Sequence, residues 1–480
     1  MRTFFTFLGV ILLATFLACN SDKGTTQPPP EIDYSTIPTD QISYAQHVQV
    51  ILNEYAGKLQ SAGLYPPGLQ MDSWENLMKG WEHGEVVIPF DADNSLLIEL
   101  STKANLTDQL RNDKLDLLIR WINAGCKNDA GEVPFADSPE RLYVCSQGEA
   151  IVDIIDVANL VVMRTVDLTQ FGFPRSAKPH HIEFTPDHNF WFVSCIDPEV
   201  DRVLKFDVAT NQLQGEATTN IPALLAHHPT EDILYVSRFM INNTSDHFIH
   251  VLNSATMQPF DNGNNGDINL PPNMKVPHAM AIDGMGNYAY TASLTEDVVL
   301  VIDHQTKEFV DFIDLGMDRT PLQIAISPDN TRAYVSCIGT GEIVVIDISD
   351  PNNRHIVGAV QVGGQPWHGT FLPDGSKFYV GNLANNTFSV INTADLSVQT
   401  YGAGDGSDGL AQPHGIAASS DGRYVFISGR NTGGDYVPTF DLGDNAGIGT
   451  VVVINTADNS IVKVIEIENF GSGMRLWTAP

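Results

Sequence analysis

From about residue 138 to the C-terminus, short apolar runs alternate with polar turns in a pattern that recurs at a spacing of roughly 45–50 residues. Val, Ile, Tyr and Phe dominate the runs, and Gly, Asn, Asp and Pro bound them. Runs of this composition and length are typical of antiparallel strands joined by tight turns. A repeat of this length predicts the four-stranded blades of a β-propeller.

Each repeat contains three phrases in a fixed order. The first is a turn that opens a strand with proline, at Pro179, Pro277, Pro321, Pro366 and Pro413, with a weaker copy at Pro222. The second is a strand led by an aromatic residue, at Tyr143, Phe192, Tyr235, Tyr290, Tyr334, Tyr379 and Phe426. The third is an apolar strand that ends in Asp or Asn, at Asp156, Asp207, Asn253, Asp303, Asp347, Asn392 and Asn455. Seven copies of the last two phrases predict seven blades.

The first repeat lacks the proline-led phrase, and the last residues of the chain supply a candidate for it. Residues 473–477 (GMRLW) form an apolar stretch that has no repeat of its own. A terminal strand that completes the first blade closes the ring and leaves no exposed sheet edge. The expected fold is therefore mainly β, a seven-bladed β-propeller over residues 138–480 that the C-terminal strand closes.

The N-terminus has the pattern of an export signal. Arg2 precedes an uncharged apolar run over residues 4–18, which is short for a membrane-spanning helix. The run ends at Leu17-Ala18-Cys19, which resembles the lipobox of bacterial lipoproteins and implies acylation of Cys19. An ordinary secretory signal with a chance cysteine is the alternative. We predict a signal peptide over 1–18, a proline-rich tether over 19–40, and a lipid-anchored protein of the cell envelope that faces the periplasm or the exterior.

Residues 41–130 predict a small helical domain. Helical patterns open it at residues 42–52 and close it at residues 115–122. Its phrases 44–52, 74–78, 89–97 and 121–125 resemble the small cytochrome c-like domains that are fused to exported bacterial proteins. That family binds haem through a CxxCH motif, and residues 53–61 contain no cysteine. Haem c is therefore not expected, and the domain is interpreted as a degenerate spacer or docking module.

The charge limits the kinds of partner that are expected, and the cysteine content bears on disulfide pairing. The chain carries 58 acidic and 26 basic residues, a net charge of −32. Such a surface repels nucleic acid, so no nucleic-acid partner is expected. Beyond Cys19, four cysteines remain without CxxC spacing, and the sequence leaves their pairing open.

Five histidines gather at one mouth of the predicted central channel, because the proline-led strands line it. These candidate metal ligands are His180, His181, His278, His368 and His414. Further candidates for the same face are Cys195, Cys337, Arg238 and Arg430. Converging imidazoles suit copper, zinc or another borderline metal. Histidines that cap strand ends are the structural alternative.

The repeats resemble those of YVTN propellers, whose neighbouring superfamilies include nitrous oxide reductase, nitrite reductases with a specialised haem, and bacterial lactonases. In nitrous oxide reductase, rings of histidines hold a copper–sulfide cluster, and His180-His181 resembles a histidine pair of that site. Ala223 and Leu322 depart from the pattern. No catalytic residue is identified.

Three functions follow from these observations. The first is a binding or scaffold lipoprotein that presents a propeller face, with a histidine-lined metal or ligand site, to a protein or small molecule. The second is a copper-dependent redox protein that a separate donor supplies with electrons. The third, lactone hydrolysis, rests on fold analogy alone. The insertion at residues 429–449 is expected on the same face as the channel mouth that carries the five histidines, as a lid or partner-binding loop.

Overall fold

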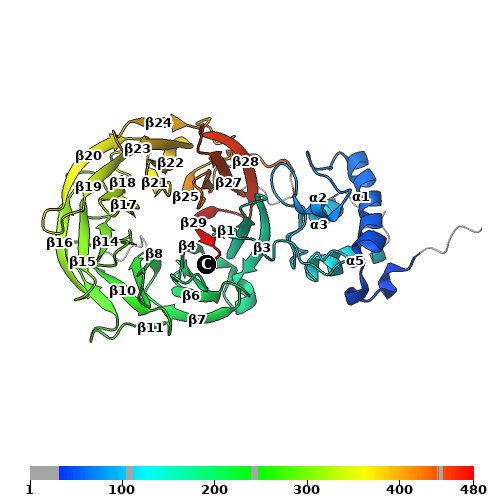
Figure 1. Cartoon of the computed structure of the whole chain (residues 1–480), viewed down its shortest axis with the longest axis horizontal. Coiled ribbons are helices and arrows are strands. Elements are labelled where there is room, and N and C mark those ends of the chain that lie inside the picture. The colour runs from blue at the N-terminus through cyan, green and yellow to red at the C-terminus, as the bar shows by residue number, and fades with distance from the viewer. Residues whose placement is uncertain (1–31, 104–111, 239–246, 441, 443–446) are drawn as a thin grey trace, which may run out of the picture.

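The computed structural model describes residues 32–103, 112–238, 247–440, 442 and 447–480, which form a ring of sheets with a helical domain beside it (Figure 1). The predicted signal peptide, the predicted acylation site Cys19 and most of the predicted tether lie outside the described residues. Among the described residues, no helix is both long and apolar enough to cross a membrane.

Seven sheets surround the central axis, and six of them are built from consecutive strands. The strands of blades 2 to 4 are β4 (Pro179–Phe184), β5 (Phe190–Cys195), β6 (Arg202–Asp207) and β7 (Leu213–Thr218); β8 (Pro222–His227), β9 (Ile233–Arg238), β10 (Phe248–Asn253), β11 (Gln258–Pro259) and β12 (Asp267–Asn269); and β13 (Ala281–Ile282), β14 (Tyr288–Ser293), β15 (Val298–Asp303) and β16 (Glu308–Asp314). The strands of blades 5 to 7 are β17 (Pro321–Ile326), β18 (Arg332–Cys337), β19 (Glu342–Asp347) and β20 (His355–Gln361); β21 (Pro366–Phe371), β22 (Lys377–Asn382), β23 (Thr387–Asn392) and β24 (Val398–Tyr401); and β25 (Pro413–Ala418), β26 (Tyr424–Gly429), β27 (Gly449–Asn455) and β28 (Ser460–Ile467).

Blade 1 is the exception, because the last strand of the chain completes it. Its order is β29 (Gly471–Thr478), β1 (Glu140–Ser146), β2 (Ile151–Asp156) and β3 (Val161–Asp167). β29 is antiparallel to β1, with Met474 opposite Val144 and Trp477 opposite Arg141. The Trp477 indole Nε1 also donates to the His188 carbonyl of blade 2 at 2.9 Å. The predicted seven-bladed propeller and its closure by the C-terminal strand are confirmed.

Neighbouring blades pack face to face through the aromatic residues of the repeat. Between blades 1 and 2, Tyr143 packs against Trp191, and Trp191 stacks on Phe206 with ring centroids 4.4 Å apart. Both faces of a blade are covered in this way, so the middle strands are apolar on both sides. This packing explains why an aromatic residue opens the second phrase of every repeat.

The helical domain contains short helices around its own core. Its elements are the turns η1 (Tyr34–Thr36) and η2 (Thr39–Gln41), the π-helix η3 (Tyr44–Val48), and the helices α1 (Gln49–Ala62), α2 (Trp74–Met78), α3 (Leu96–Lys103) and α5 (Asn112–Asn123). Packed structure begins before residue 41, since Tyr34 is buried and its carbonyl accepts from Arg120 at 3.0 Å. Short 3-10 turns lie elsewhere at η4 (Leu168–Phe171), η5 (Arg175–Ala177) and η6 (Leu383–Asn385).

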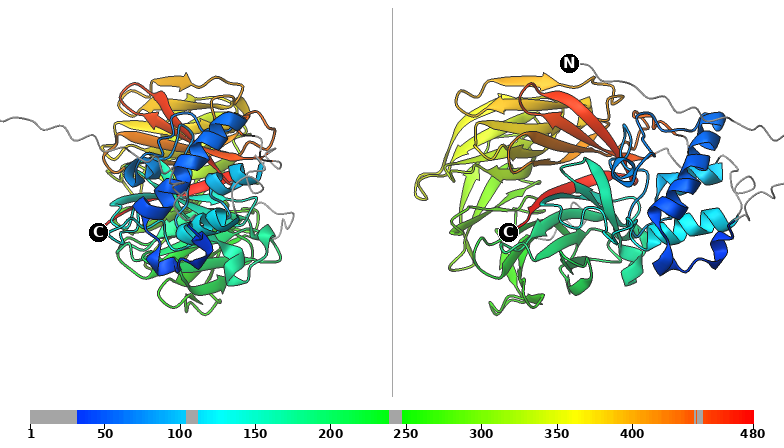
Figure 2. Two further views of the ribbon diagram at one scale, coloured as in Figure 1. Left: turned by 90° about the vertical axis from the view of Figure 1, so that its right-hand side faces the viewer. Right: turned by 45° about the vertical axis from the view of Figure 1, so that its right-hand side comes forward.

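The helical domain docks on the outer edge of blades 1 and 7 and lies beside the ring (Figures 1 and 2). The His83 carbonyl accepts from the Glu466 amide of β28 at 2.9 Å. On the other side, the Val162 amide of β3 donates to Glu85 at 3.0 Å. The described part of the insertion at residues 429–449 reaches this contact, where Phe440 packs on Trp81 within the core of the helical domain. Phe440 therefore ties the insertion to the helical domain, and a role of the insertion as a lid or partner-binding loop stays a prediction.

Candidate functional site

Proline places the hub histidines at one end of the inner strands. β4, β21 and β25 each begin with proline, and Pro277 forms an isolated bridge to Ser293 at the equivalent place in blade 4. Proline suits this position because a strand's first residue needs no ladder N–H. The residue after each proline therefore lies at the same mouth of the channel, next to the axis.

The histidine rings come together there across the blades. The His414 ring centroid lies 4.8 Å from that of His368 and 5.5 Å from that of His180. The His180 ring also contacts that of His278, at 6.2 Å, and the His181 ring contacts that of His368, at 6.4 Å. The structure thus brings all five sequence-predicted histidines into one connected cluster, which we call the hub cluster.

Glycine allows the inner strands to approach closely enough for this contact. A Cβ on Gly473 would lie 2.1 Å from the His180 carbonyl oxygen, and a Cβ on Gly415 would lie 2.2 Å from the Ser472 carbonyl oxygen. Any side chain at either position would push blades 1, 2 and 7 apart.

The hydrogen bonds of the ring nitrogens differ within the hub cluster. His278 Nδ1 lies 3.0 Å from the Leu322 carbonyl, so in the neutral ring Nδ1 carries the proton and Nε2 carries the lone pair. His181 Nδ1 accepts from the Leu225 amide at 3.2 Å. His414 is completely buried, and neither of its nitrogens has a hydrogen-bond partner among the described residues. The same is true of His368 Nε2.

Burial keeps the hub imidazoles neutral. It lowers the pKa of His180, His368 and His414 well below the ordinary value, with smaller contributions from neighbouring imidazoles and Arg430. Burial also lowers the pKa of His181 to about 3 and that of His278 to about 4. Neutral imidazole is the form that binds metal ions, so no proton has to be displaced at neutral pH.

Arg430, a candidate for this face in the sequence, lies beside the hub cluster. Its guanidinium sits between two aromatic rings, 4.6 Å from the centroid of Phe470 and 5.3 Å from that of Trp367. Burial lowers its pKa to about 10, so the group remains a cation at neutral pH. Arg238 ends β9 at the same edge of the ring, but its guanidinium packs over Phe248 at 4.5 Å.

Cys195 and Cys337 lie at the predicted end of their strands, opposite Pro179 and Pro321, but their thiols do not face the opening. Both thiols lie in apolar clusters between blades, where Cys195 packs with Trp191 and Val193. Burial raises the pKa of both thiols, that of Cys337 to about 12. The alternation of side chains along β5 and β18 directs them into the gap between blades, which a neighbouring blade fills.

Below the hub cluster, polar side chains line the channel. A cavity of 380 Å³ has walls that include His181, His368, Gln323 and an ion pair of Glu183 with Arg475 at 3.2 Å. A neighbouring cavity of 400 Å³ shares four of these residues, all except Glu183. The sequence analysis missed Glu183, Gln323 and Arg475. Their position in the inner strands, two to four residues after the repeat's first position, is the pattern that would have indicated them.

One other histidine group has metal-like spacing. Among the described residues, His228, Glu231 and His304 place one ligand atom each within 4.8 Å of one another. The nitrogens of His228 already accept from the Thr230 and Glu231 amides and contact the Gly286 carbonyl. His304 contacts the Tyr235 hydroxyl at 2.8 Å. These bonds explain the group as structural.

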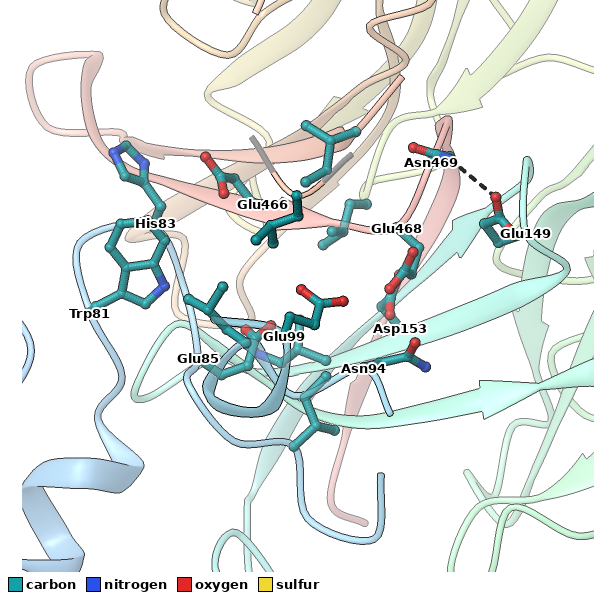
Figure 3. A pocket seen from close by; sticks show the side chains of 16 residues that line it. Trp81, His83, Glu85, Asn94, Glu99, Glu149, Asp153, Glu466, Glu468 and Asn469 are labelled. Carbon is teal, nitrogen blue, oxygen red and sulfur yellow. Dashed lines mark hydrogen bonds between the residues drawn. The ribbon is translucent and has the colours of Figure 1, made fainter. Parts of the chain in front are cut away.

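Carboxylates line a cavity of 250 Å³ between the helical domain and the propeller (Figure 3). Its acidic residues are Glu85 and Glu99 of the helical domain and Glu149, Asp153, Glu466 and Glu468 of the propeller. Burial raises the pKa of Glu85 and of Glu468 to about 7, and that of Asp153 well above its ordinary value. Nothing in the repeat pattern indicated this cavity, because it forms only where the two domains meet.

Comparisons with known proteins agree with this architecture. A family model described as "Lactonase, 7-bladed beta-propeller" matches residues 317–459. No curated protein matches the sequence. A solved structure of a functionally unknown protein from Desulfotomaculum acetoxidans is 14% identical, with a TM-score of 0.54 over 71% of this chain and 99% of that chain.

Two further solved structures are similar. One from Bacteroides uniformis, described as a candidate 6-phosphogluconolactonase, is 13% identical, with a TM-score of 0.51 over 71% of this chain and all of that one (100%). The other, Kuenenia stuttgartiensis hydrazine synthase, is 20% identical, with a TM-score of 0.49 over 62% of this chain and 88% of that one. The chain is a seven-bladed β-propeller that is similar, over residues 317–459, to the lactonase propellers.

Proposed function

We propose that this protein is a lipid-anchored binding protein of the cell envelope whose hub cluster binds a borderline transition metal ion, copper or zinc. The observation that carries the proposal is His414, a completely buried imidazole with two nitrogens that have no hydrogen-bond partner among the described residues. A buried polar group in this state costs about 1–3 kcal/mol, and a metal ion would remove that cost.

The ring spacing suits a shared ion. With metal–nitrogen bonds of about 2.0–2.1 Å, a ring centre lies about 3.2 Å from the ion, and two ring centres on a tetrahedral ion lie about 5.2 Å apart. The separations of 4.8 Å and 5.5 Å from His414 to His368 and His180 bracket that value. Three nitrogens of the hub cluster do not all lie within 4.8 Å of one another, so binding requires the rings to rotate toward the axis.

Arg430 adds a condition on the bound species. Its guanidinium is a buried cation beside the rings, and it opposes a second positive charge. An anionic ligand on the metal, such as hydroxide or the carboxylate of a small molecule, would offset this repulsion. We therefore expect the metal to bind together with an anion, which the polar channel below the hub cluster can admit.

Two alternative functions can be distinguished from metal binding by experiment. Copper bound at the hub cluster could carry electrons from a separate donor, which is the redox alternative. Lactone hydrolysis is favoured by the family-model match over residues 317–459, which include His368 and His414. The ion pair of Glu183 with Arg475 would then lie in the substrate cavity.

Metal analysis tests the proposal. Protein loaded with Cu²⁺ or Zn²⁺ and then desalted should retain about one ion per chain, and a His180→Ala/His414→Ala variant should retain none. His355→Ala, an exposed histidine on β20, is the matched control and should retain the ion. Equal retention by the hub variant, or no retention by the parent protein, would remove the proposal. Hydrolysis of 6-phosphogluconolactone by metal-free protein would favour the lactonase alternative instead.

A further inference from the structure

The largest of the four cavities in this account lies away from the hub cluster, between the helical domain and blades 1 and 2. It measures 660 Å³, within the range of small-molecule sites. The loop at residues 89–93 and Phe135 form one wall, β3 forms the floor, and the β6–β7 turn at residues 209–212 forms the rim. A pocket between two domains, with both polar and aromatic walls, is a common place for a ligand to bind.

Two arginines share this cavity and the same face of blade 1. Arg164 on β3 is opposite Ile154, and Ile154 is opposite Tyr143. Arg141 precedes Tyr143 by two residues on β1. Directly paired residues lie on one face of a sheet, and so do residues two apart along a strand. Both guanidiniums therefore face the cavity that the helical domain covers.

Neither guanidinium has a carboxylate partner among the described residues, although the chain carries 58 acidic residues. Arg164 packs over the Phe90 ring at 4.7 Å and donates to the Met163 carbonyl. Arg141 packs over the Trp477 ring at 4.6 Å, and its buried Nε has no hydrogen-bond partner within the described part of the chain. Burial, with a smaller contribution from Arg141, lowers the pKa of Arg164 to about 10, so Arg164 remains a cation at neutral pH.

Three aspartates also line the cavity, and two of them accept hydrogen bonds from neighbouring groups. Asp91 accepts from the Asn94 amide and from the Thr165 hydroxyl. Asp167 accepts from the Thr169 amide at 2.8 Å and from its hydroxyl. Asp93 is exposed at the rim. These three carboxylates share the cavity with the two arginines, but none of them forms an ion pair with either guanidinium among the described residues. Guanidinium donors that no carboxylate uses remain open to an anion that enters the cavity.

We infer that this cavity binds a small anionic molecule, with Arg141 and Arg164 holding a phosphate monoester and the rings of Phe90, Phe135 and Phe171 packing on an apolar or aromatic part. Two guanidiniums match a dianion, and their planar donor sets suit phosphate oxygens. Asn211, whose buried Oδ1 lacks a hydrogen-bond partner among the described residues, can accept from a hydroxyl of the same ligand. This site is separate from the hub cluster and does not depend on the proposed function.

Calorimetry with phenyl phosphate as the probe, at 0.15 M salt, tests the inference. Phenyl phosphate should bind more tightly than inorganic phosphate, and neutral phenol should not bind. Arg164→Gln should weaken phenyl phosphate by about 10- to 100-fold, because one charge-assisted contact is lost. Arg423→Gln, which removes an exposed arginine paired with Asp421, is the control and should leave the affinity unchanged.

A second variant keeps the test independent of any effect that the Arg164→Gln substitution has on folding. Ala209→Trp fills the exposed rim and leaves both arginines in place, so it should also abolish binding. Unaltered affinity in either cavity variant would overturn the inference, as would the absence of binding to the parent protein at millimolar probe. Equal binding of phosphate by the Arg423 control and by Arg164→Gln would show an adventitious ion only, and would overturn it too.

Discussion

The acidic cavity between the domains predicts that the protein becomes less stable as the pH rises. Burial raises the pKa of Glu85 and of Glu468 from 4.5, the value for Glu, to about 7. A carboxyl with a raised pKa in the folded state holds its proton there while the unfolded chain releases it. The folded state is therefore favoured below about pH 4.5, and this contribution is lost as the pH rises through about 7.

The loss of stability can be calculated from the size of the pKa shift. A difference of about 2.5 pKa units corresponds to about 3 kcal/mol for one group. The free energy for Glu85 and Glu468 together is smaller than twice that value, because repulsion from Glu468 is itself one cause of the pKa shift of Glu85. Lys463 lowers the pKa of Glu85, and Arg175 lowers that of Glu468, but in each case burial raises the pKa by more.

Urea unfolding of a Glu85→Gln/Glu468→Gln variant measures this directly. Glutamine keeps the shape and can still accept from the Val162 amide that bonds to Glu85. At pH 8 the variant should be more stable than the parent by about 3 kcal/mol, and at pH 5 the difference should fall below about 1 kcal/mol. Glu82→Gln, an exposed residue of the same loop, should show neither change. A gain that is equal at both pH values, or larger at pH 5, would refute the reasoning.

Four further results are expected. Trp477→Ala should cost about 4 kcal/mol in urea unfolding, because a buried indole that closes blade 1 is lost, and a cost under about 1 kcal/mol would contradict the closure. Phe440→Ala should speed proteolytic release of the helical domain, whereas unchanged cleavage would contradict the docking role of the insertion. Cys19→Ser should abolish acylation in a mass spectrum of the exported protein, and an identical mass shift in the variant would exclude the lipid anchor. The buried thiols should resist iodoacetamide until urea is added, and fast labelling of the native protein would contradict their burial; they are Cys126, Cys145, Cys195 and Cys337.

The propeller and the position of the hub cluster could be predicted because both follow from the repeat. A proline at a fixed place in each repeat sets the start of an inner strand, so His180, His278 and His414 had to lie at one mouth. The direction of the Cys195 thiol could not be predicted, because a strand end can face either gap between blades, and the repeat alone does not say which.

The interdomain features could not be predicted from the same pattern. Arg164 and Glu468 belong to outer or connecting segments of different blades, and only the docked helical domain turns their surroundings into cavities. Phe440 joins the core of the helical domain from an insertion more than 300 residues away in sequence. Contacts of this kind depend on tertiary packing and leave no local periodicity.

The most direct test of the hub proposal is an anomalous difference map from crystals of the copper-loaded protein, recorded at the copper edge. The account predicts one peak on the channel axis, within about 2.0–2.2 Å of nitrogens from His414 and at least two other histidines of the hub cluster. A peak only at His228 and His304, a peak only in the acidic cavity between the domains, or no peak at full loading would contradict it.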